Sequence, residues 1–484
     1  MTARLAAANG SIDAEDADPH RSRPDQQRIQ SAINACPHGS AVRLVAIAGR
    51  DGFLSGPLLL KSGVTLWIDR GVTLFASRSP ADYDNGSGHC GTATQQRERD
   101  CTPFITARKT SGSGIVGDGA IDGRGGSLLT SGPNAGRRSW WDVAFQNKTE
   151  RLYQQNPLLI DVVGGDHFTL YRVKMMNAPN FHFLSDGTST ITAWNIKILS
   201  PSRVYTRPGY RCPADTTPDK ATPATCFTPD TVKNTDGFDP GQSDHVLLTQ
   251  SYISVGDDNV AVKSHGRISS RNLAFVDNHF YYGHGMSIGS ETDSGVSTMI
   301  VRGLAVDGSD AVTSTGIRIK SDSSRGGLVS GVSYDRICLR NIRYPMVFTA
   351  YYSKDAQGQK PPRFQNISVH DFHDLGSARY GGGEVTLTGR TGVSGALELN
   401  LDNVVIEGRV TISGPPHNAP NASGMGAASR VILGPGPVSF ADALSRAPGM
   451  AIQYRHDGGP MGAVALDCSH AFVDMAAVVP EAPF

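Results

Sequence analysis

Short apolar or alternating runs follow one another along most of the chain. They are separated by Gly, Asp, Asn or Ser, which favour tight turns. The runs lie at residues 42–45, 58–60, 64–68, 72–75, 114–121, 158–163, 168–175 and 191–198. This pattern predicts an all-β chain with little helix after its start. Ile29, Ala32 and Ile33 are at helical spacing and predict one short helix over residues 25–36, before the first strand.

Four segments in the middle of the chain align with one another as repeats. They cover residues 236–240, 258–264, 284–290 and 315–321. In this alignment Phe238, Val260, Met286 and Ile317 fall in register, at spacings of 22, 26 and 31 residues. Two or three short strands per repeat are typical of a solenoid coil, whereas a propeller blade needs roughly 40 residues. The sequence therefore predicts a single-stranded right-handed parallel β-helix with the short helix as its N-terminal cap.

Several acids recur at one position of these repeats. Asp236, Asp258 and His284 are aligned, and Asp257 directly precedes Asp258. Because equivalent residues of successive coils stack about 4.8 Å apart, we expect these side chains to form a column. Carboxylates crowded in this way cannot all ionise at their ordinary pKa, so one is held protonated while the others stay charged. That arrangement suits general acid and base catalysis on a glycosidic bond.

Two cations lie on the outer face of a later repeat. Side chains alternate along a strand, so Ile317 and Ile319 are predicted to point inward while Arg318 and Lys320 face solvent. Each feature alone has an ordinary explanation, because Asp-Gly pairs are common in turns and an Arg-x-Lys is usually a solvated surface. Their recurrence at one edge of consecutive coils favours a site for an acidic sugar instead.

Composition excludes several other classes of protein. Lys and Arg number 45 and Asp and Glu number 45, so the formal net charge is +0 and we expect no nucleic-acid partner. No apolar run approaches the roughly 20 residues of a membrane span, and we expect no signal peptide in this chain. Among seven cysteines, Cys90 with Cys101 and Cys212 with Cys226 each bracket a loop-like segment and are predicted to form local disulfides.

Together these motifs resemble those of the polygalacturonases of glycoside hydrolase family 28. The four family motifs occur in order as Asn234-Thr-Asp-Gly237, Gly256-Asp-Asp258, Gly283-His-Gly285 and Arg318-Ile-Lys320. Further similarity to bacterial endopolygalacturonases covers residues 53–57, 69–74, 177–182 and 283–291. The resemblance implies a pectin-lyase-like solenoid that hydrolyses α-1,4-linked galacturonan with inversion. It implies no metal and no cofactor.

The resemblance also implies roles for the acids and their histidine. Asp257 would be the general acid that protonates the leaving oxygen, Asp236 and Asp258 would activate the water, and His284 would tune the proton of the acid. Carboxylates one coil apart are closer than the roughly 6.5–9.5 Å usual for inverting enzymes. Inversion is therefore an expectation from the resemblance alone.

Substrate binding is assigned in the same way. Arg318 and Lys320 would bind substrate carboxylates, Tyr352 matches a tyrosine of the family's subsites, and Asn234 belongs to the first motif. Residues 202–233 form an insertion directly before that motif, and it could close one end of the groove. An open groove permits endo cleavage and a closed one forces exo cleavage; overall similarity favours endo action.

The predicted organisation is a polar N-terminal tail (1–24), a β-helix catalytic domain (25–415) and a C-terminal extension or cap (416–484). The expected partner is pectic polysaccharide, the expected state is a monomer, and the expected location is secreted or periplasmic. Two alternatives stay open at this point. A β-helix pectate lyase would need calcium and would be abolished by a chelator, and a non-enzymatic polysaccharide-binding β-helix would tolerate Asp257→Asn.

Overall fold

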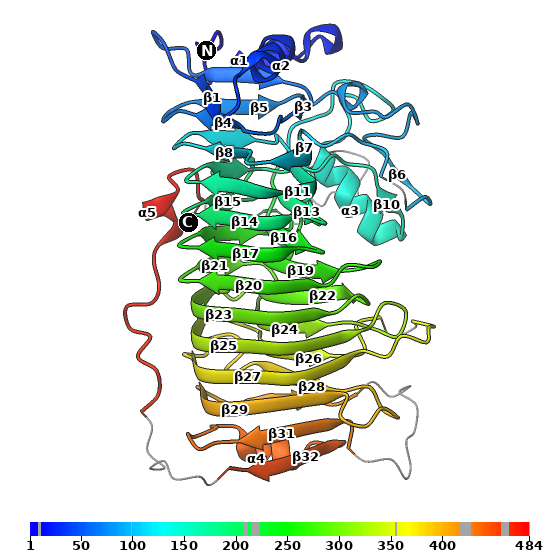
Figure 1. Cartoon of the computed structure of the whole chain (residues 1–484), viewed down its shortest axis with the longest axis vertical. Coiled ribbons are helices and arrows are strands. Elements are labelled where there is room, and N and C mark those ends of the chain that lie inside the picture. The colour runs from blue at the N-terminus through cyan, green and yellow to red at the C-terminus, as the bar shows by residue number, and fades with distance from the viewer. Residues whose placement is uncertain are drawn as a thin grey trace. The chain divides into compact units, whose positions relative to one another are not determined.

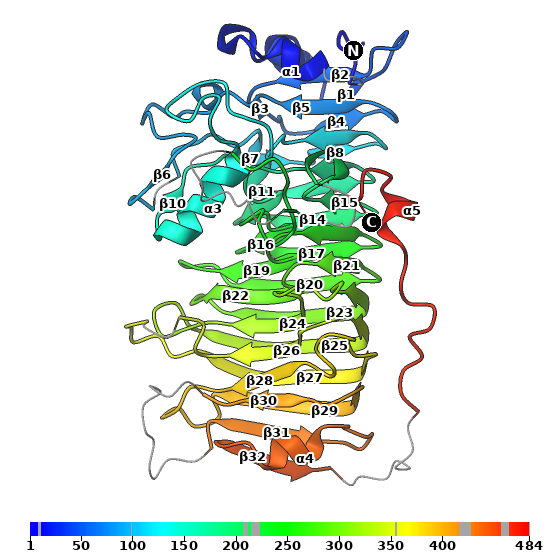
Figure 2. The same ribbon diagram turned by 180° about the vertical axis from the view of Figure 1, so that it is seen from behind.

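The computed structural model describes residues 1–7, 11–97, 99–206, 212–213, 223–353, 356–415, 427–455 and 464–483. The chain forms two compact units. The first unit contains Met1–Asp239, Ser251–Asp258 and Asp474–Phe484, and the second contains Pro240–Gln250 and Asn259–Val473. Both are built from stacked parallel strands, so the predicted parallel β-helix is confirmed (Figures 1 and 2).

The first unit begins with the predicted helix, which covers Gln26–Ala35 (α2) and buries Ile29 and Ile33. The other helices of this unit are α1 (Ser11–Glu15), η2 (Pro19–Arg21), η3 (Pro80–Asp82), α3 (Trp140–Glu150), η4 (Arg203–Tyr205) and α5 (Met475–Val478). Its strands are β1 (Ser40–Leu44), β2 (Gly52–Ser55), β3 (Leu58–Leu59), β4 (Val64–Ile68), β5 (Thr73–Ala76), β6 (Ala93–Thr94), β7 (Ile105–Ser111), β8 (Gly114–Val116), β9 (Ala120–Asp122), β10 (Tyr153–Gln154), β11 (Ile160–Tyr171), β12 (Lys174–Met176), β13 (Phe183–Asp186), β14 (Ser189–Trp194), β15 (Lys197–Leu199) and β18 (Tyr252–Val255).

These strands pair in parallel columns. One column runs through β1, β4, β8, β11 and β14, a second through β2, β5, β9, β12, β15 and β18, and a third through β3, β7, β11 and β13. The register stacks buried aliphatic side chains on one another; Val42, Leu66, Ile115, Leu170 and Ala193 form one such row. Each large aliphatic side chain buried in this way contributes about 1.5–3 kcal/mol.

The second unit repeats the same construction with longer strands. Its elements are β17 (Asp244–Thr249), β19 (Val260–Ser264), β20 (Ser270–Val276), β21 (His279–Tyr282), β22 (Met286–Thr292), β23 (Val296–Asp307), β24 (Thr315–Lys320), β25 (Leu328–Arg340), β26 (Tyr344–Thr349), β27 (Arg363–Asp374), β28 (Glu384–Thr388), β29 (Leu397–Ile406), β30 (Thr411–Ser413), β31 (Ser429–Leu433), α4 (Ala441–Ser445) and β32 (Met450–Tyr454). Strand β16 (Phe238–Gly241) spans the boundary. The predicted register is confirmed here, because Met286 pairs with both Val260 and Ile317.

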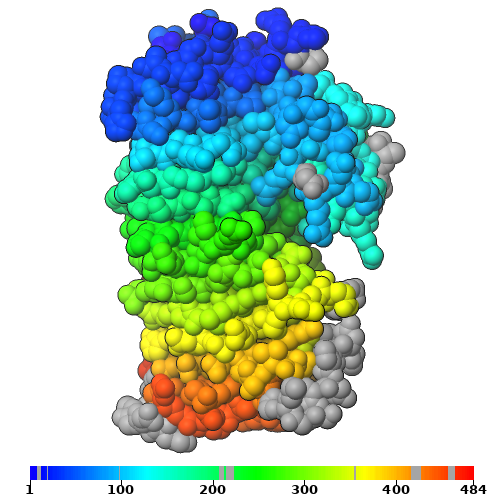
Figure 3. Space-filling view, turned by 45° about the vertical axis from the view of Figure 1, so that its right-hand side comes forward, coloured from blue at the N-terminus to red at the C-terminus, as the bar shows by residue number. Residues whose placement is uncertain are grey.

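Loops of the first unit stand out from its coils. The segment that carries β6, α3 and β10 projects from the stacked strands, as the blue to cyan surface in Figure 3 shows. Helix α3 was not predicted. It starts with a capping box in which Ser139 and Asp142 bond each other's backbone N–H groups, and it buries Trp140 and Trp141.

The predicted division at residues 24 and 415 stays a prediction, and the structure shows how the chain packs on either side of it. Residues 1–24 are not merely a polar tail, because Asp16 is fully buried and pairs with Arg78 and Arg124. Strands also continue beyond residue 415, since β31 pairs with β29 and with β32. Residues 416–426 lie outside the described residues.

Both predicted disulfides are present, Cys90–Cys101 and Cys212–Cys226. A third, Cys338–Cys468, joins residues 130 positions apart and was not predicted. The remaining Cys36 is buried and free. No helix among the described residues has the length and apolar character to cross a membrane.

Candidate active site

The three predicted acids lie on adjacent coils of the first unit. Asp236 lies two residues before β16, and Asp257 and Asp258 lie in the turn after β18. The N–H of Gly237 donates to the carbonyl of Asp258 at 2.9 Å. Thr235 precedes Asp236 and Gly256 precedes Asp257, and these two residues are also joined. The N–H of Gly256 donates to Oγ1 of Thr235 at 2.9 Å. These two bonds fix the Asp236 turn against the Asp257–Asp258 turn.

The acids differ in their exposure. Asp236 and Asp258 are 4% and 1% exposed, whereas Asp257 is half-buried. The Oδ1 of Asp257 accepts from the N–H of Asp258 at 3.0 Å, which fixes the direction of its side chain. Asp257 is thus the acid that a ligand reaches most easily.

Gly256 allows the turn that holds Asp257 to lie close to the backbone of residues 229–232. A Cβ on Gly256 would lie 2.4 Å from the carbonyl oxygens of Pro229 and Val232, closer than real Cβ contacts. The turn that holds Asp257 therefore rests directly on the backbone of the segment leading to Asn234. Asn234 adopts the left-handed conformation, with φ 56°, and its Oδ1 accepts from Nε2 of Gln154 at 3.1 Å.

His182 contacts the backbone of Asp236 from within the coil. It was not predicted as a functional residue, although it is the last residue of the 177–182 segment that resembles bacterial endopolygalacturonases. Its backbone N–H donates to the carbonyl of Asp236 at 2.9 Å, and its Nδ1 lies 3.0 Å from the same oxygen. A carbonyl only accepts, so Nδ1 carries the proton and Nε2 accepts from Oγ of Ser200 at 2.9 Å. Complete burial lowers the pKa of His182 to about 4, so this imidazole stays neutral.

Lys233 is a second residue that was not predicted. Burial is the main cause that lowers its pKa, and Lys148 lowers it further, while Asp230 and Asp257 raise it. Lys233 is therefore a half-buried cation within electrostatic reach of Asp257. It is the last residue of the predicted 202–233 insertion.

The remaining predicted residues lie in the second unit. His284 occupies the turn between β21 and β22, where a Cβ on Gly285 would lie 2.1 Å from the carbonyl of Gly316. The Gly285 N–H donates to Oδ1 of Asn259 at 2.9 Å, and Nδ2 of Asn259 donates to the carbonyl of Tyr281. The His284 turn is thus held in close contact with the next coil.

The two predicted cations follow on β24. Nε of Arg318 donates to Oγ of Ser287 on the neighbouring strand at 3.0 Å. Lys320 was predicted to face solvent but is only 5% exposed, because its Nζ lies under the ring of Tyr352, 5.0 Å from the centroid. Tyr352 itself is 50% exposed, so one face of its ring is open to a ligand.

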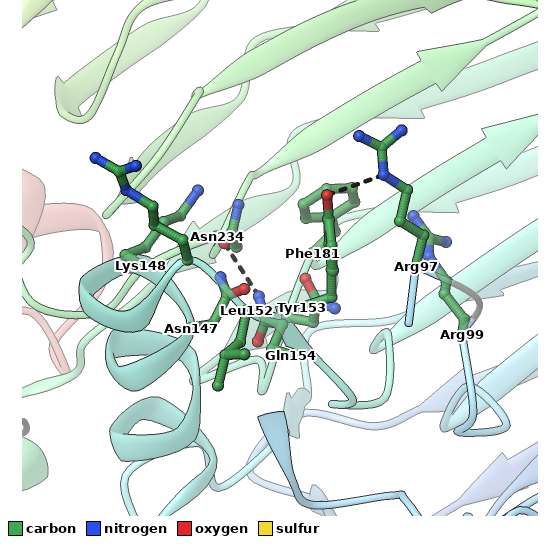
Figure 4. Close-up of a pocket in the computed structure, with 11 residues that line it drawn as sticks. Arg97, Arg99, Asn147, Lys148, Leu152, Tyr153, Gln154, Phe181 and Asn234 are labelled. Carbon is green, nitrogen blue, oxygen red and sulfur yellow. Dashed lines mark hydrogen bonds between the residues drawn. The ribbon is translucent and has the colours of Figure 1, made fainter. Parts of the chain in front are cut away.

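The first unit also contains a basic pocket beside Asn234, with a volume of about 430 Å³ (Figure 4). We call it the basic pocket. It is lined by Arg97, Arg99, Asn147, Lys148, Arg151, Leu152, Tyr153, Gln154, Asn180, Phe181 and Asn234. Four of these side chains are cationic and none is acidic. This cluster of cations was not predicted, because its residues come from separate segments of the chain.

A group that could hold a metal lies elsewhere in the second unit. Asp335, His370 and Asp371 on β25 and β27 have ligand atoms within 4.8 Å of one another. Nε of Arg302 also contacts Asp335, at 2.8 Å. This guanidinium already supplies positive charge to the group, and none of these residues belongs to the predicted site.

Comparisons with known proteins agree with the motifs. The profile of the glycosyl hydrolases family 28 matches residues 36–422. A polygalacturonase of Ralstonia nicotianae is 56% identical over 486 aligned residues, covering 100% of this chain and 91% of that protein. An endo-polygalacturonase of Pectobacterium carotovorum subsp. carotovorum is 39% identical over 345 residues, covering 71% and 76%. The solved polygalacturonase of Erwinia carotovora ssp. carotovora superposes with a TM-score of 0.67 at 33% identity, covering 87% of this chain and 95% of that one.

Proposed function

Because the chain belongs to the glycosyl hydrolases family 28, it is a glycoside hydrolase of pectin, and we propose that it cleaves the α-1,4 bonds of polygalacturonate by endo attack with inversion. The predicted motif residues carry the reaction in this proposal. The observation that supports it is the pairing of the Asp236 turn with the Asp257–Asp258 turn through the 2.9 Å bond from Gly237 to Asp258.

Asp257 is the proposed general acid. It gives its proton to the glycosidic oxygen as the bond from that oxygen to the anomeric carbon breaks. A water attacks the anomeric carbon from the opposite face, and Asp236 or Asp258 accepts the proton of that water. The products are a new reducing end of inverted configuration and the free hydroxyl of the leaving sugar. His284 tunes the proton of the acid.

Positive charge in both units matches the acidic substrate. Arg318 has its Nε fixed by Ser287, so we assign its guanidinium to a substrate carboxylate. Lys320, buried under Tyr352, is assigned to a second carboxylate, and the exposed face of Tyr352 to a sugar ring. Asn234, held by Gln154, binds substrate next to the acids.

Endo action is supported by a relative whose name states this mode of cleavage. The Pectobacterium relative, named an endo-polygalacturonase, is 39% identical and covers 71% of this chain. The described part of the 202–233 insertion packs inward within its own unit: Tyr205 and Phe227 contact the ring of Trp141 at centroid distances of 5.3 and 5.0 Å. Residues 207–211 and 214–222 lie outside the described residues.

We also propose that the enzyme acts outside the cytoplasm as a monomer. Three disulfides support the location, because such bonds persist in oxidising compartments. A polymeric substrate that cannot enter a cell supports it further.

The test is a time-resolved product profile on polygalacturonate in EDTA, with wild type, Asp257→Asn and the control Asp166→Asn, whose side chain is 42% exposed. We expect wild type and the control to release a spread of oligogalacturonides early, and Asp257→Asn to lose about 10²–10⁴-fold in kcat, since general acid catalysis contributes that much. Monomer alone from the start would contradict endo action. Loss of activity in EDTA, together with a new ultraviolet absorbance of the products when EDTA is omitted, would indicate a lyase. Full activity of Asp257→Asn would overturn the acid assignment.

A further inference from the structure

Neighbouring strands of the second unit share a sharp bend. It falls at Asp371 on β27 and at Asn403 on β29, whose φ angles are 49° and 54°. A left-handed residue interrupts the alternation of side chains along a strand, so His370 and Asp371 both lie outside the core although they are adjacent in sequence. Val369 before them and Phe372 after them are buried. The bend thus brings an imidazole and a carboxylate of one strand to the same surface.

The register adds a carboxylate from each neighbouring strand. Strands β25, β27 and β29 lie one below another (Figure 1), and His370 pairs with Asp335 of β25 on one side and with Asp402 of β29 on the other. Nδ1 of His370 lies 3.3 Å from Oδ1 of Asp335 and 3.3 Å from Oδ2 of Asp371. These three ligand atoms lie within 4.8 Å of one another. We call Asp335, His370 and Asp371 the bend triad.

The spacing of the bend triad fits a small divalent ion. Ligand atoms in tetrahedral zinc sites lie about 2.0–2.1 Å from the ion, so two of them are about 3.3–3.4 Å apart. Both distances from Nδ1 of His370 match this separation. The imidazole favours an ion of the zinc class over Ca²⁺ or Mg²⁺, which prefer oxygen ligands alone. The side chain of His370 is 50% exposed, so an ion reaches the triad from solvent.

Two members of the bend triad are oriented by partners at their other polar atoms. Nε of Arg302 donates to Oδ2 of Asp335 at 2.8 Å, which leaves Oδ1 of that carboxylate facing His370. Nε2 of His370 lies 3.5 Å from Oδ2 of Asp402, so the carboxylate of Asp402 favours a proton on Nε2 and a free electron pair on Nδ1. Metal ligands in proteins typically have such outer partners, which fix the direction of the coordinating atom.

Asn403 is an independent sign of a ligand at this place. Its side chain is directed at the third member of the triad, because its Nδ2 donates to Oδ1 of Asp371 at 2.6 Å, and only 6% of Asn403 is exposed. Its Oδ1 is buried and has no hydrogen-bond partner in the part of the chain that the structure describes. A buried amide oxygen without a partner costs free energy, and a water coordinated to an ion beside Asp371 would supply the missing donor.

The charges around the bend triad also suit a cation. Two arginines lie against Asp335, Arg302 at 2.8 Å and Arg336 at 4.0 Å. Among the described residues, neither Asp371 nor Asp402 forms a salt bridge with a lysine or an arginine. Two of the three carboxylates therefore face the histidine without a permanent positive charge of the protein beside them.

We propose that the bend triad binds one divalent transition-metal ion of the zinc class, through Nδ1 of His370 and one carboxylate oxygen each of Asp335 and Asp371. The ion joins β25 to β27, while Asp402 holds the histidine ligand from β29. It stabilises the second unit and takes no part in hydrolysis, because the folded chain presents the three ligands together and the unfolded chain does not. The proposal does not depend on the proposed function.

The test is calorimetric titration of ZnCl₂ into the untagged full chain after EDTA has been removed by dialysis. The parent protein carries Asp257→Asn, so that this carboxylate of the predicted site does not compete for the ion. We expect the parent to bind one Zn²⁺ per chain. Loss of an outer partner costs about 10–100-fold in metal affinity, so Asp402→Asn should weaken binding about tenfold and His370→Gln, which loses a ligand, more than about 100-fold. His245→Gln is the matched control, because this exposed histidine also contacts a carboxylate at 2.8 Å; it should bind Zn²⁺ as the parent does.

Thermal unfolding of the same proteins gives a second readout. Added Zn²⁺ should raise the midpoint of the parent and of His245→Gln equally and leave that of His370→Gln unchanged, since an ion bound only to the folded chain stabilises it. Circular dichroism without metal checks that His370→Gln is folded, and Asp371→Asn, which keeps the shape of its side chain, is expected to show the same two losses. Equal Zn²⁺ affinity of the parent and of both triad variants, or no binding by the parent at millimolar Zn²⁺, would overturn the proposal.

Discussion

The neutral imidazole of His182 leads to a specific expectation for stability against acid. His182 is completely buried, donates from Nδ1 to the carbonyl of Asp236 and accepts at Nε2 from Ser200. Burial lowers its pKa to about 4, from an ordinary value of 6.5. Between these two values the unfolded chain binds a proton that the folded chain excludes. The free energy of unfolding therefore falls as the pH drops from about 6.5 to about 4.

The size of this effect follows from the shift. One pKa unit corresponds to 1.36 kcal/mol, so lowering the pKa from 6.5 to about 4 gives about 3 kcal/mol, present in full above pH 6.5 and lost by pH 4. His182→Gln removes the titrating group while its amide can still donate to one partner and accept from the other. We expect the variant to be less stable than wild type at pH 7, and the gap to close by about 3 kcal/mol at pH 4.

Urea unfolding followed by tryptophan fluorescence at pH 7, 6, 5 and 4 measures this gap. His265→Gln is the control, because that side chain is exposed and its replacement should give a difference that does not change with pH. A His182→Gln difference that stays constant over this range would refute the argument, since it would mean that the fold does not exclude a proton from His182.

Two further changes test the packing around the site. Gly256→Ala places a Cβ 2.4 Å from the carbonyls of Pro229 and Val232, so the turn that holds Asp257 must shift; we expect kcat to fall more than about tenfold with circular dichroism unchanged. Gly414→Ala meets nothing closer than 3.5 Å and should match wild type; equal activity of both variants would contradict the close-packing argument. Cys338→Ser with Cys468→Ser opens a loop of 130 residues and should cost about 5 kcal/mol, seen as a lower thermal midpoint. An unchanged midpoint would show that this disulfide does not constrain the unfolded chain.

Periodicity carried most of the fold prediction, because the coils repeat the same local rule. The segment Val64–Ile68 alternates buried and outward side chains and was predicted to the residue, and the row through Val260, Met286 and Ile317 followed from alignment of the repeats. Features that do not repeat were missed. Helix α3 occurs once, although its capping box, Ser139 with Asp142, is a local signal that could have revealed it.

The motif residues could be found from the sequence, but their surroundings could not. Lys320 is buried under Tyr352, which follows β26, the strand paired with β24. Alternation along β24 alone therefore predicted an exposed cation, which is wrong. The Cys338–Cys468 disulfide joins residues 130 positions apart, and spacing favours only nearby partners. The basic pocket gathers side chains from four separate segments and needs the fold to be known first.

The last residues of the chain belong to the first unit. Asp474–Phe484 is part of it, and the carboxylate of Glu481 pairs with Lys174, 307 positions earlier. A ribosome adds about 5–20 residues per second, so roughly 15–60 s separate the synthesis of these two partners. During that interval the earliest coils exist without their closing segment. The first unit therefore completes its contacts only after residues 474–484 have been synthesised, and a chain stopped shortly before residue 474 would release a product whose first unit is incomplete.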